Sequence, residues 1–64
     1  MKIAIEGMHC QACVRRVEKA LASVEGAKVE SVEIGSALVE ADAAREAQAL
    51  EAVRQVGYPA RKTE

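Results

Sequence analysis

Residues 2–17 read KIAIEGMHCQACVRRV, and this stretch passes from a strand pattern through a short loop to the start of a helix. Residues 2–6 alternate polar and apolar side chains, as a strand covered on one face does. The two cysteines of the chain, Cys10 and Cys13, follow that strand and lie three positions apart. If Cys10 lies on the loop and Cys13 in the first helical turn, both thiols can point at one atom. The stretch therefore predicts a two-thiol site where a strand meets a helix.

Helical patterns occupy two parts of the chain. From residue 11 to residue 24, apolar side chains recur at helical spacing, and these are Cys13, Val14, Val17, Leu21 and Val24. Gly26 is expected to take the left-handed position that ends this helix. A second helix is expected from an N-cap at Asp42 to Val56, closed by Gly57. The residues that it is expected to bury are Ala43, Ala47, Leu50, Val53 and Val56.

Between the two helices the sequence predicts a β-hairpin. Residues 35–36, Gly-Ser, form a two-residue turn signal between two short apolar runs. Four residues then share one face of the sheet in two opposed pairs, Ile34 with Ala37 and Val32 with Val39. The start of the first hairpin strand stays open, because Val29 falls out of phase with these residues. Residues 58–62 predict a short last strand, and Pro59 requires that strand to lie at an edge because it has no N–H to donate.

The expected order is strand, helix, strand, strand, helix, strand. It predicts an α+β domain of the ferredoxin-like βαββαβ type, in which two helices cover one face of a four-stranded antiparallel sheet. Residues 1–64 are expected to form a single domain, because a chain of 64 residues buries only about 60% of its unfolded surface in one small core. Such a core leaves no room for a deep substrate cleft, so we expect no enzymatic activity.

Composition argues against several classes of partner. Nine basic and ten acidic residues give a net charge of −1, so no overall field draws the chain to DNA or to an anionic membrane. Tyr58 is the one aromatic residue, whereas single-stranded nucleic acids bind on several stacking side chains. The sequence shows neither a secretory signal nor a segment long enough to span a membrane. We expect a cytoplasmic protein with reduced thiols that binds no nucleic acid and has no stable membrane association.

A cysteine pair in a reduced chain is more typical of a metal or redox site than of a disulfide. The N-terminus of the first helix favours a thiolate at Cys13, because unpaired backbone N–H groups lie there. Structural zinc requires four ligands, and the soft or borderline donors here are Cys10, Cys13 and His9. Cu(I) is matched by two thiolates, which leave the ion open to a partner's ligands. We therefore expect one Cu(I) per chain, bound by Cys10 and Cys13, and no catalytic residues.

Several further residues are candidates for the surroundings of this site. Met8 is interpreted as a core residue under the loop, with a ligand role as the alternative. His9 is expected to face solvent, and a third-ligand role for it stays open. Tyr58, just after the second helix, either caps the core or lies over the metal loop. The candidate docking residues for an acidic partner surface are Arg15, Arg16 and Lys19, whose alternative role is a solvated helix face.

Residues 7–13, Gly-Met-His-Cys-Gln-Ala-Cys, resemble the Gly-Met-x-Cys-x-x-Cys signature of the heavy-metal-associated domain. Small bacterial copper chaperones and the N-terminal modules of copper-transporting P-type ATPases carry this domain. The resemblance covers essentially the whole chain. It implies Cu(I) ligation by Cys10 and Cys13, loop support by Met8, and a place beside the metal loop for Tyr58. His9 stands where the family more often has Thr, which leaves an extra ligand or altered exchange open.

The thiol pair and the resemblance together predict a cytosolic Cu(I) chaperone. It is expected to deliver Cu(I) by thiolate exchange to a copper-transporting P-type ATPase or to the metal-binding domain of that ATPase. Three alternatives stay open: a carrier or scavenger of mercury, silver, zinc or cadmium, a metal-binding module of an ATPase, and a thiol-disulfide redox protein. We expect a monomer without metal, and a metal-bridged dimer through facing cysteine loops also stays open.

Overall fold

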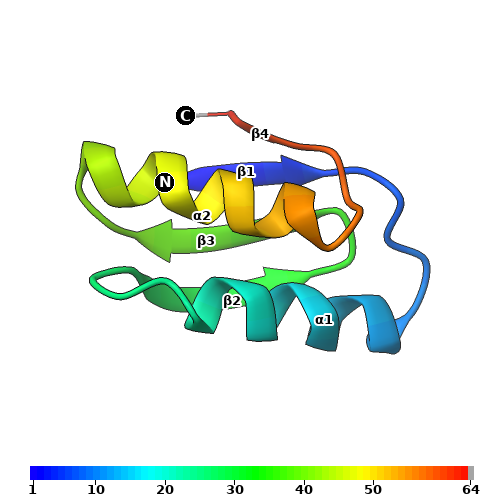
Figure 1. The fold of residues 1–64 in the computed structure, drawn as a ribbon. Coiled ribbons are helices and arrows are strands. Elements are labelled where there is room, and N and C mark those ends of the chain that lie inside the picture. The colour runs from blue at the N-terminus through cyan, green and yellow to red at the C-terminus, as the bar shows by residue number, and fades with distance from the viewer. Residues whose placement is uncertain (64) are drawn as a thin grey trace.

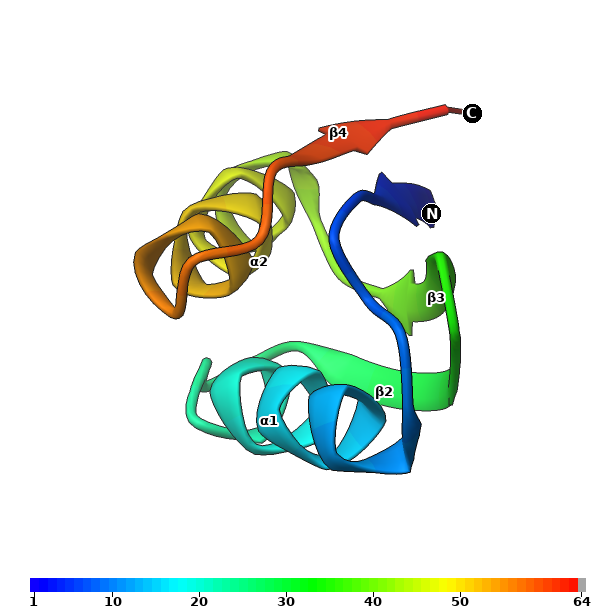
Figure 2. The same cartoon turned by 90° about the vertical axis from the view of Figure 1, so that its right-hand side faces the viewer.

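The computed structural model describes residues 1–63, which form six elements of secondary structure. In chain order these are β1 (Lys2–Ile5), α1 (Gln11–Ala22), β2 (Lys28–Glu33), β3 (Ser36–Glu40), α2 (Ala43–Gln55) and β4 (Ala60–Lys62). The strands form one antiparallel sheet in the order β2-β3-β1-β4. Both helices cover the same face of that sheet (Figure 1, Figure 2). The predicted ferredoxin-like βαββαβ fold is confirmed.

Three connections meet at one end of the molecule. The β1–α1 loop, the β2–β3 turn and the α2–β4 loop all lie at the right-hand end of Figure 1, and this end faces the viewer in Figure 2. Backbone hydrogen bonds join them, from Ile5 N–H to Gly35 O at 2.9 Å and from Glu6 N–H to Pro59 O at 2.8 Å. The loop that carries the cysteines is therefore held between two neighbouring loops.

The core lies between the helices and the sheet and is almost entirely aliphatic. Its fully buried larger side chains come from four of the six elements, and they are Ile3, Val17, Leu21, Val39 and Val53. Burying each such side chain contributes roughly 1.5–3 kcal/mol. Among residues 1–63 no polar or charged side chain is buried. Apolar contacts therefore hold the two helices against the sheet. Polar side chains form hydrogen bonds near the ends of the helices and strands.

The hairpin register differs from the predicted one. The turn consists of Ile34 and Gly35, and Val32 lies opposite Ala37. Gly35 has a φ of +92° and Ile34 has a negative φ, which is the pattern of a type II turn with glycine at its second central position. The prediction of a turn with glycine at the first central position was therefore wrong. Ile34 consequently leaves the apolar face and is 51% exposed.

An irregularity in β2 explains why Val29 was out of phase in the sequence. Val29 lies opposite Val39, and Ser31 lies opposite Leu38, so one extra residue stands between the two pairs on β2. Such a bulge shifts the alternation of side chains by one position. Val29 and Val32 therefore both pack against the core although they are three residues apart.

The first helix is shorter than expected. It ends at Ala22, with Ser23 as its C-cap, and not at Val24. The Ser23 hydroxyl donates to the carbonyl of Ala20 at 2.6 Å, which offers the chain an alternative to a further helical turn. Gly26 does adopt a positive φ, of +85°, but in the turn that follows and not at the helix end.

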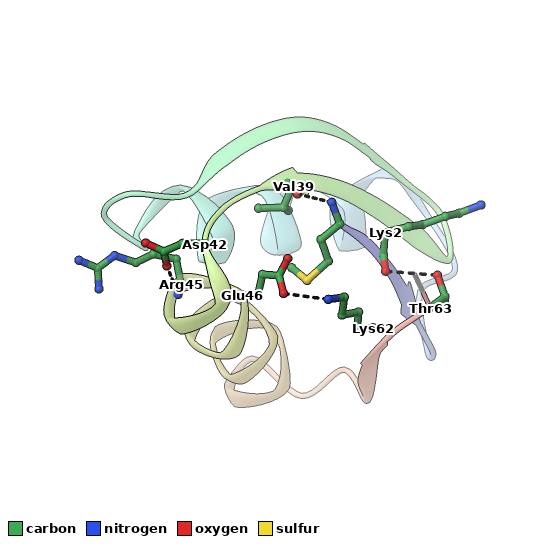
Figure 3. Close-up of polar contacts among 8 residues, drawn as sticks. Lys2, Val39, Asp42, Arg45, Glu46, Lys62 and Thr63 are labelled. Atoms are coloured by element: carbon green, nitrogen blue, oxygen red, sulfur yellow. Dashed lines mark hydrogen bonds and ion pairs between the residues drawn. The ribbon is translucent and has the colours of Figure 1, made fainter.

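The second helix, α2, begins as predicted and ends one residue earlier than expected, at Gln55, whereas its buried face agrees with the prediction only in part. Asp42 caps the helix by accepting a hydrogen bond from the Arg45 N–H at 2.9 Å (Figure 3). Gly57, with a φ of +100°, follows the last turn. The buried helical residues are Ala49 and Val53, while Leu50 is half-buried and Ala43, Ala47 and Val56 are exposed. Alanines occur all around this helix, so composition alone does not define which side faces the core.

The last strand is an edge strand, as Pro59 required, although it begins at Ala60 and not at residue 58. Lys62 reaches Glu46 of α2 with its ammonium 3.0 Å from a carboxylate oxygen, and Thr63 bonds to the carbonyl of Lys2 (Figure 3). These contacts fix β4 to α2 on one side and to β1 on the other. No helix within residues 1–63 has the length and apolar character needed to cross a membrane.

The Asp42 cap provides a test of the α2 boundary. Replacing Asp42 with Ala is expected to cost about 1 kcal/mol, because the amide of Arg45 loses its acceptor. In a domain of this size that change corresponds to a fall of about 4–8 °C in the melting temperature. Thermal unfolding followed by circular dichroism measures it. Asp42→Asn, which keeps an acceptor, should lose much less, and equal losses in both variants would contradict the assignment.

Candidate metal centre

The first turn of α1 determines where the two thiols lie. Cys10 is the N-cap, with extended backbone (φ −157°, ψ 174°), and its carbonyl accepts from the Cys13 N–H at 3.0 Å. Within the described chain the Cys10 side chain makes no capping hydrogen bond, so its sulfur is left for another role. Cys13 is one turn further along the same helix end. The fold thus places both sulfur atoms on the same side of the loop.

The two sulfurs are 3.9 Å apart, and both cysteines are reduced. This separation is far longer than a disulfide bond of about 2.05 Å. Metal–thiolate bonds are about 2.3 Å long, so two sulfurs on opposite sides of one ion would be about 4.6 Å apart. Moving the sulfurs outward by less than about 1 Å would therefore admit an ion between them. The pair is close to a two-coordinate thiolate site.

Within the described residues, Cys10 and Cys13 are the two candidate metal ligands that lie together. No group of three or more His, Cys, Asp or Glu side chains suited to a metal ion occurs within residues 1–63. His9 is exposed and is not part of such a group. A closed tetrahedral zinc site requires four ligands. One chain therefore offers two thiolates and an open side, which suits a soft ion of low coordination number.

Met8 lies in the core beneath the loop. It is 6% exposed, and its sulfur accepts a hydrogen bond from the Gly35 N–H at 3.4 Å. The sulfur is therefore directed toward the hairpin turn. The predicted turn, at residues 35–36, lies one residue after the observed one, so the sequence did not predict the contact between Gly35 and Met8. The signal that predicts the observed turn is a glycine at the second central position, as a type II turn requires, and Gly35 with its φ of +92° occupies it.

Tyr58 packs against the beginning of the cysteine loop. It is 7% exposed, and a β-carbon at Gly7 would lie 3.5 Å from its Cδ1 atom. Gly7 also has a φ of +86°, a conformation that costs glycine little and other residues more. Tyr58 therefore combines the two places that the sequence offered for it, because it belongs to the core and also lies next to the metal loop.

The surroundings of Cys13 favour its thiolate form. The backbone of His9 and then the side chain of Tyr58 are the largest influences, and together with smaller contributions from Cys10 they lower the pKa of Cys13 to about 7. Partial burial opposes this effect by disfavouring the charge. A substantial fraction of Cys13 is consequently ionised at neutral pH. Metal ligands must be deprotonated, so this loop is prepared to bind a cation.

The three basic candidates on α1 differ in their relation to the site. Arg16 interacts with the Tyr58 side chain and with the charge on Cys13, and these interactions raise the pKa of its guanidinium. Arg15 and Lys19 line a shallow groove between α1 and the edge strand β2, together with Val29 and Val32. Arg16 therefore lies beside the thiols, whereas Arg15 and Lys19 border a surface farther along the helix.

Removal of the Tyr58 hydroxyl tests the electrostatics of the loop. Tyr58→Phe is expected to raise the pKa of Cys13 above 7, but not to that of a free thiol, because the His9 backbone still lowers it. A folded-state pKa below the unfolded one adds stability at high pH that is lost as pH falls through about 7. Carbon-13 NMR of the Cys13 Cβ against pH measures the titration. An unchanged midpoint in the variant would contradict this role for Tyr58.

Comparison with known proteins agrees with this geometry. The copper-exporting P-type ATPase of Vibrio cholerae serotype O1 is 42% identical to this chain over an alignment of 62 residues, and the alignment covers 94% of the chain. The chain spans only 7% of the length of that ATPase. Residues 2–59 match the family described as the heavy-metal-associated domain, and both findings support heavy-metal binding. The chain belongs to the heavy-metal-associated domain family.

Proposed function

We propose that this protein is a Cu(I) chaperone, which binds one Cu(I) between Cys10 and Cys13 and delivers it to a copper-transporting P-type ATPase. The observation that carries the proposal is the pair of reduced sulfurs 3.9 Å apart with no third ligand group among residues 1–63. Two thiolates suit the soft Cu(I) ion and leave it accessible. The likeness to a copper-exporting ATPase supports copper as the cargo.

The local charges favour a bound Cu(I) ion with two thiolates. Such a unit carries a net charge of −1. The N-terminal turn of α1 presents its backbone N–H groups to this charge, and the guanidinium of Arg16 lies beside it. Both features stabilise the anionic unit without adding a ligand. We infer that the protein holds the ion through two bonds and compensates its charge through the helix and Arg16.

The two cysteines are unequally exposed, which suggests an order for the transfer. Cys10 is exposed, and Cys13 is half-buried beside Tyr58. A thiolate of the partner would add to Cu(I) on the open side, and the bond to Cys10 would break first. A second partner thiolate would then replace Cys13. Each step forms one copper–sulfur bond and breaks one, copper stays Cu(I), and the released thiolates take up protons from solvent.

The approach of the partner is expected to depend on the basic residues of α1. Arg15 and Lys19 are exposed on the helix that begins at the metal site. Exposed charges of this kind steer encounter between partners more than they determine affinity. We infer that an acidic surface on the metal-binding domain of the ATPase approaches along this helix. We further propose that the protein carries Cu(I) without catalysing a reaction. We also propose that it works in the cytoplasm.

The metal-binding part of the proposal is tested by Cu(I) competition. The reduced protein is titrated against a chromophoric Cu(I) chelator, and it is expected to withdraw one equivalent of Cu(I). The variant Cys10→Ser/Cys13→Ser should withdraw none at the same chelator concentration, because both ligands are gone. Met8→Leu, which removes a sulfur that faces the hairpin, should retain one equivalent. If the double variant competes as well as the unaltered protein, the cysteine site is not the copper site.

The docking part of the proposal is tested by transfer kinetics. Replacing Arg15 and Lys19 with Glu should slow Cu(I) transfer to the metal-binding domain of a copper-transporting ATPase by about tenfold at low salt. The difference should shrink as salt screens the exposed charges. Stopped-flow mixing measures the rate. Lys28→Glu/Arg61→Glu, which makes the same change in net charge on β2 and β4, is the control, and an equal effect from it would rule out a specific docking face.

A further inference from the structure

We propose that Arg54 is a positioning residue, which holds Tyr58 against the cysteine loop and thereby slows the release of the bound metal ion. Neither residue is a ligand in this account. The inference deepens the proposed function, because it concerns the rate at which the same thiol site gives up its cargo. It depends on the contacts of the α2–β4 connection, residues 56–59, for which the sequence suggested only that Tyr58 lies nearby.

Arg54 lies at the end of α2, and its side chain reaches across the α2–β4 connection. Its side chain leaves the last turn of α2 and donates two hydrogen bonds to the carbonyl of Ala60, from Nε at 3.0 Å and from Nη2 at 2.8 Å. Glu51, one turn earlier, lies 4.0 Å from Nη1 and helps to orient the guanidinium. A guanidinium has a rigid planar fork of donors, so two bonds to one carbonyl define the position of that carbonyl closely. Ala60 is thereby tied to the end of α2.

Two backbone hydrogen bonds also attach this connection to Val53 and Arg54. Gly57 N–H donates to the carbonyl of Arg54 at 3.0 Å, and Tyr58 N–H donates to the carbonyl of Val53 at 3.4 Å. This pair of bonds is the Schellman arrangement, which requires the positive φ that Gly57 adopts. Tyr58 consequently lies between two fixed points, the Schellman turn before it and the Ala60 carbonyl after it.

The fixed connection holds the Tyr58 ring against the metal loop. The ring is 7% exposed and lies against Gly7, and the next residue, Pro59, accepts the Glu6 N–H at 2.8 Å. Tyr58 therefore lies on the Cys13 side of the site, where its side chain interacts with the half-buried Cys13, whereas Cys10 is exposed. Loss of the Arg54 fork frees the Ala60 carbonyl and lets the ring move away. The Cys13 side then opens to competing ligands, and the metal ion is released faster.

Tyr58 supplies the readout for this inference, because it is the one aromatic residue of the chain and its fluorescence reports its own surroundings. In the metal-free protein, Arg54→Gln is expected to increase the quenching of tyrosine fluorescence by acrylamide. In the Cu(I) form it is expected to speed the transfer of Cu(I) to an excess of chelator by about tenfold, the size expected for loss of a charged hydrogen bond. Arg54→Lys should recover part of both effects, since it keeps the charge and one donor.

Controls separate positioning from a general loss of stability. Arg61→Gln removes the same charge from an exposed position on β4 and should leave both readouts unchanged. In a Tyr58→Ala background, Arg54→Gln should add nothing to the release rate, because no ring is left to position. If Arg54→Gln lowers the melting temperature while tyrosine quenching and the release rate match those of Arg61→Gln, the inference is overturned.

The same design distinguishes failure of this inference from failure of the chaperone role. The quenching measurement uses no metal, and the release measurement uses a chelator and no ATPase. A protein that binds Cu(I) but transfers none to an ATPase domain would therefore contradict the proposed function and leave the Arg54 inference standing. Conversely, normal transfer to the ATPase domain with no change of release in Arg54→Gln would contradict the inference alone.

Discussion

The hydrogen bond from the Cys13 N–H to the Cys10 carbonyl, 3.0 Å long, is the contact on which the site depends. It closes the first turn of α1 and holds one cysteine at the N-cap and the other within the helix. The sulfurs then lie 3.9 Å apart, on the side of the helix where backbone N–H groups favour negative charge. A loop without this turn would have to pay the entropy of bringing two flexible thiols together when a metal binds.

The remainder of the fold supplies the frame for that turn. The hairpin turn bonds to the Met8 sulfur through Gly35, and the α2–β4 connection places Tyr58 against Gly7. Both connections reach the cysteine loop because the strand order β2-β3-β1-β4 puts β1 in the interior of the sheet, between β3 and β4. The loop after β1 is thus flanked by the loops of its two neighbours. Met8 in the core and Tyr58 beside the loop support the thiol pair, and the side on which Cys10 is exposed stays open to an incoming ligand.

The sequence predicted the element order and the place of the cysteines, because strong signals determine both: alternation in residues 2–6, the apolar stripe of α1, and the cap at Asp42. Its errors occurred where several alternatives have similar local energies. Glycine can occupy either central position of a two-residue turn, so Gly35 alone did not distinguish a turn at residues 34–35 from one at residues 35–36. The bulge in β2 was visible in the sequence only as the phase shift of Val29, which does not by itself identify a bulge. The alanine-rich α2 offered several equivalent faces, so its contact through Ala49 came from tertiary packing. The fork from Arg54 to Ala60 joins two elements and has no sequence signature.

In the proposed function, a two-thiolate site on a small frame would allow both binding and transfer, because the free side of the ion would give an incoming ligand access while the frame keeps both sulfurs in place. X-ray absorption at the copper edge of the Cu(I)-loaded monomer tests this account most directly. The account predicts two sulfur neighbours and no nitrogen neighbour, with the same spectrum after His9→Ala. A nitrogen neighbour that disappears in His9→Ala, or a third sulfur neighbour in the monomer, would contradict a site built from Cys10 and Cys13 alone.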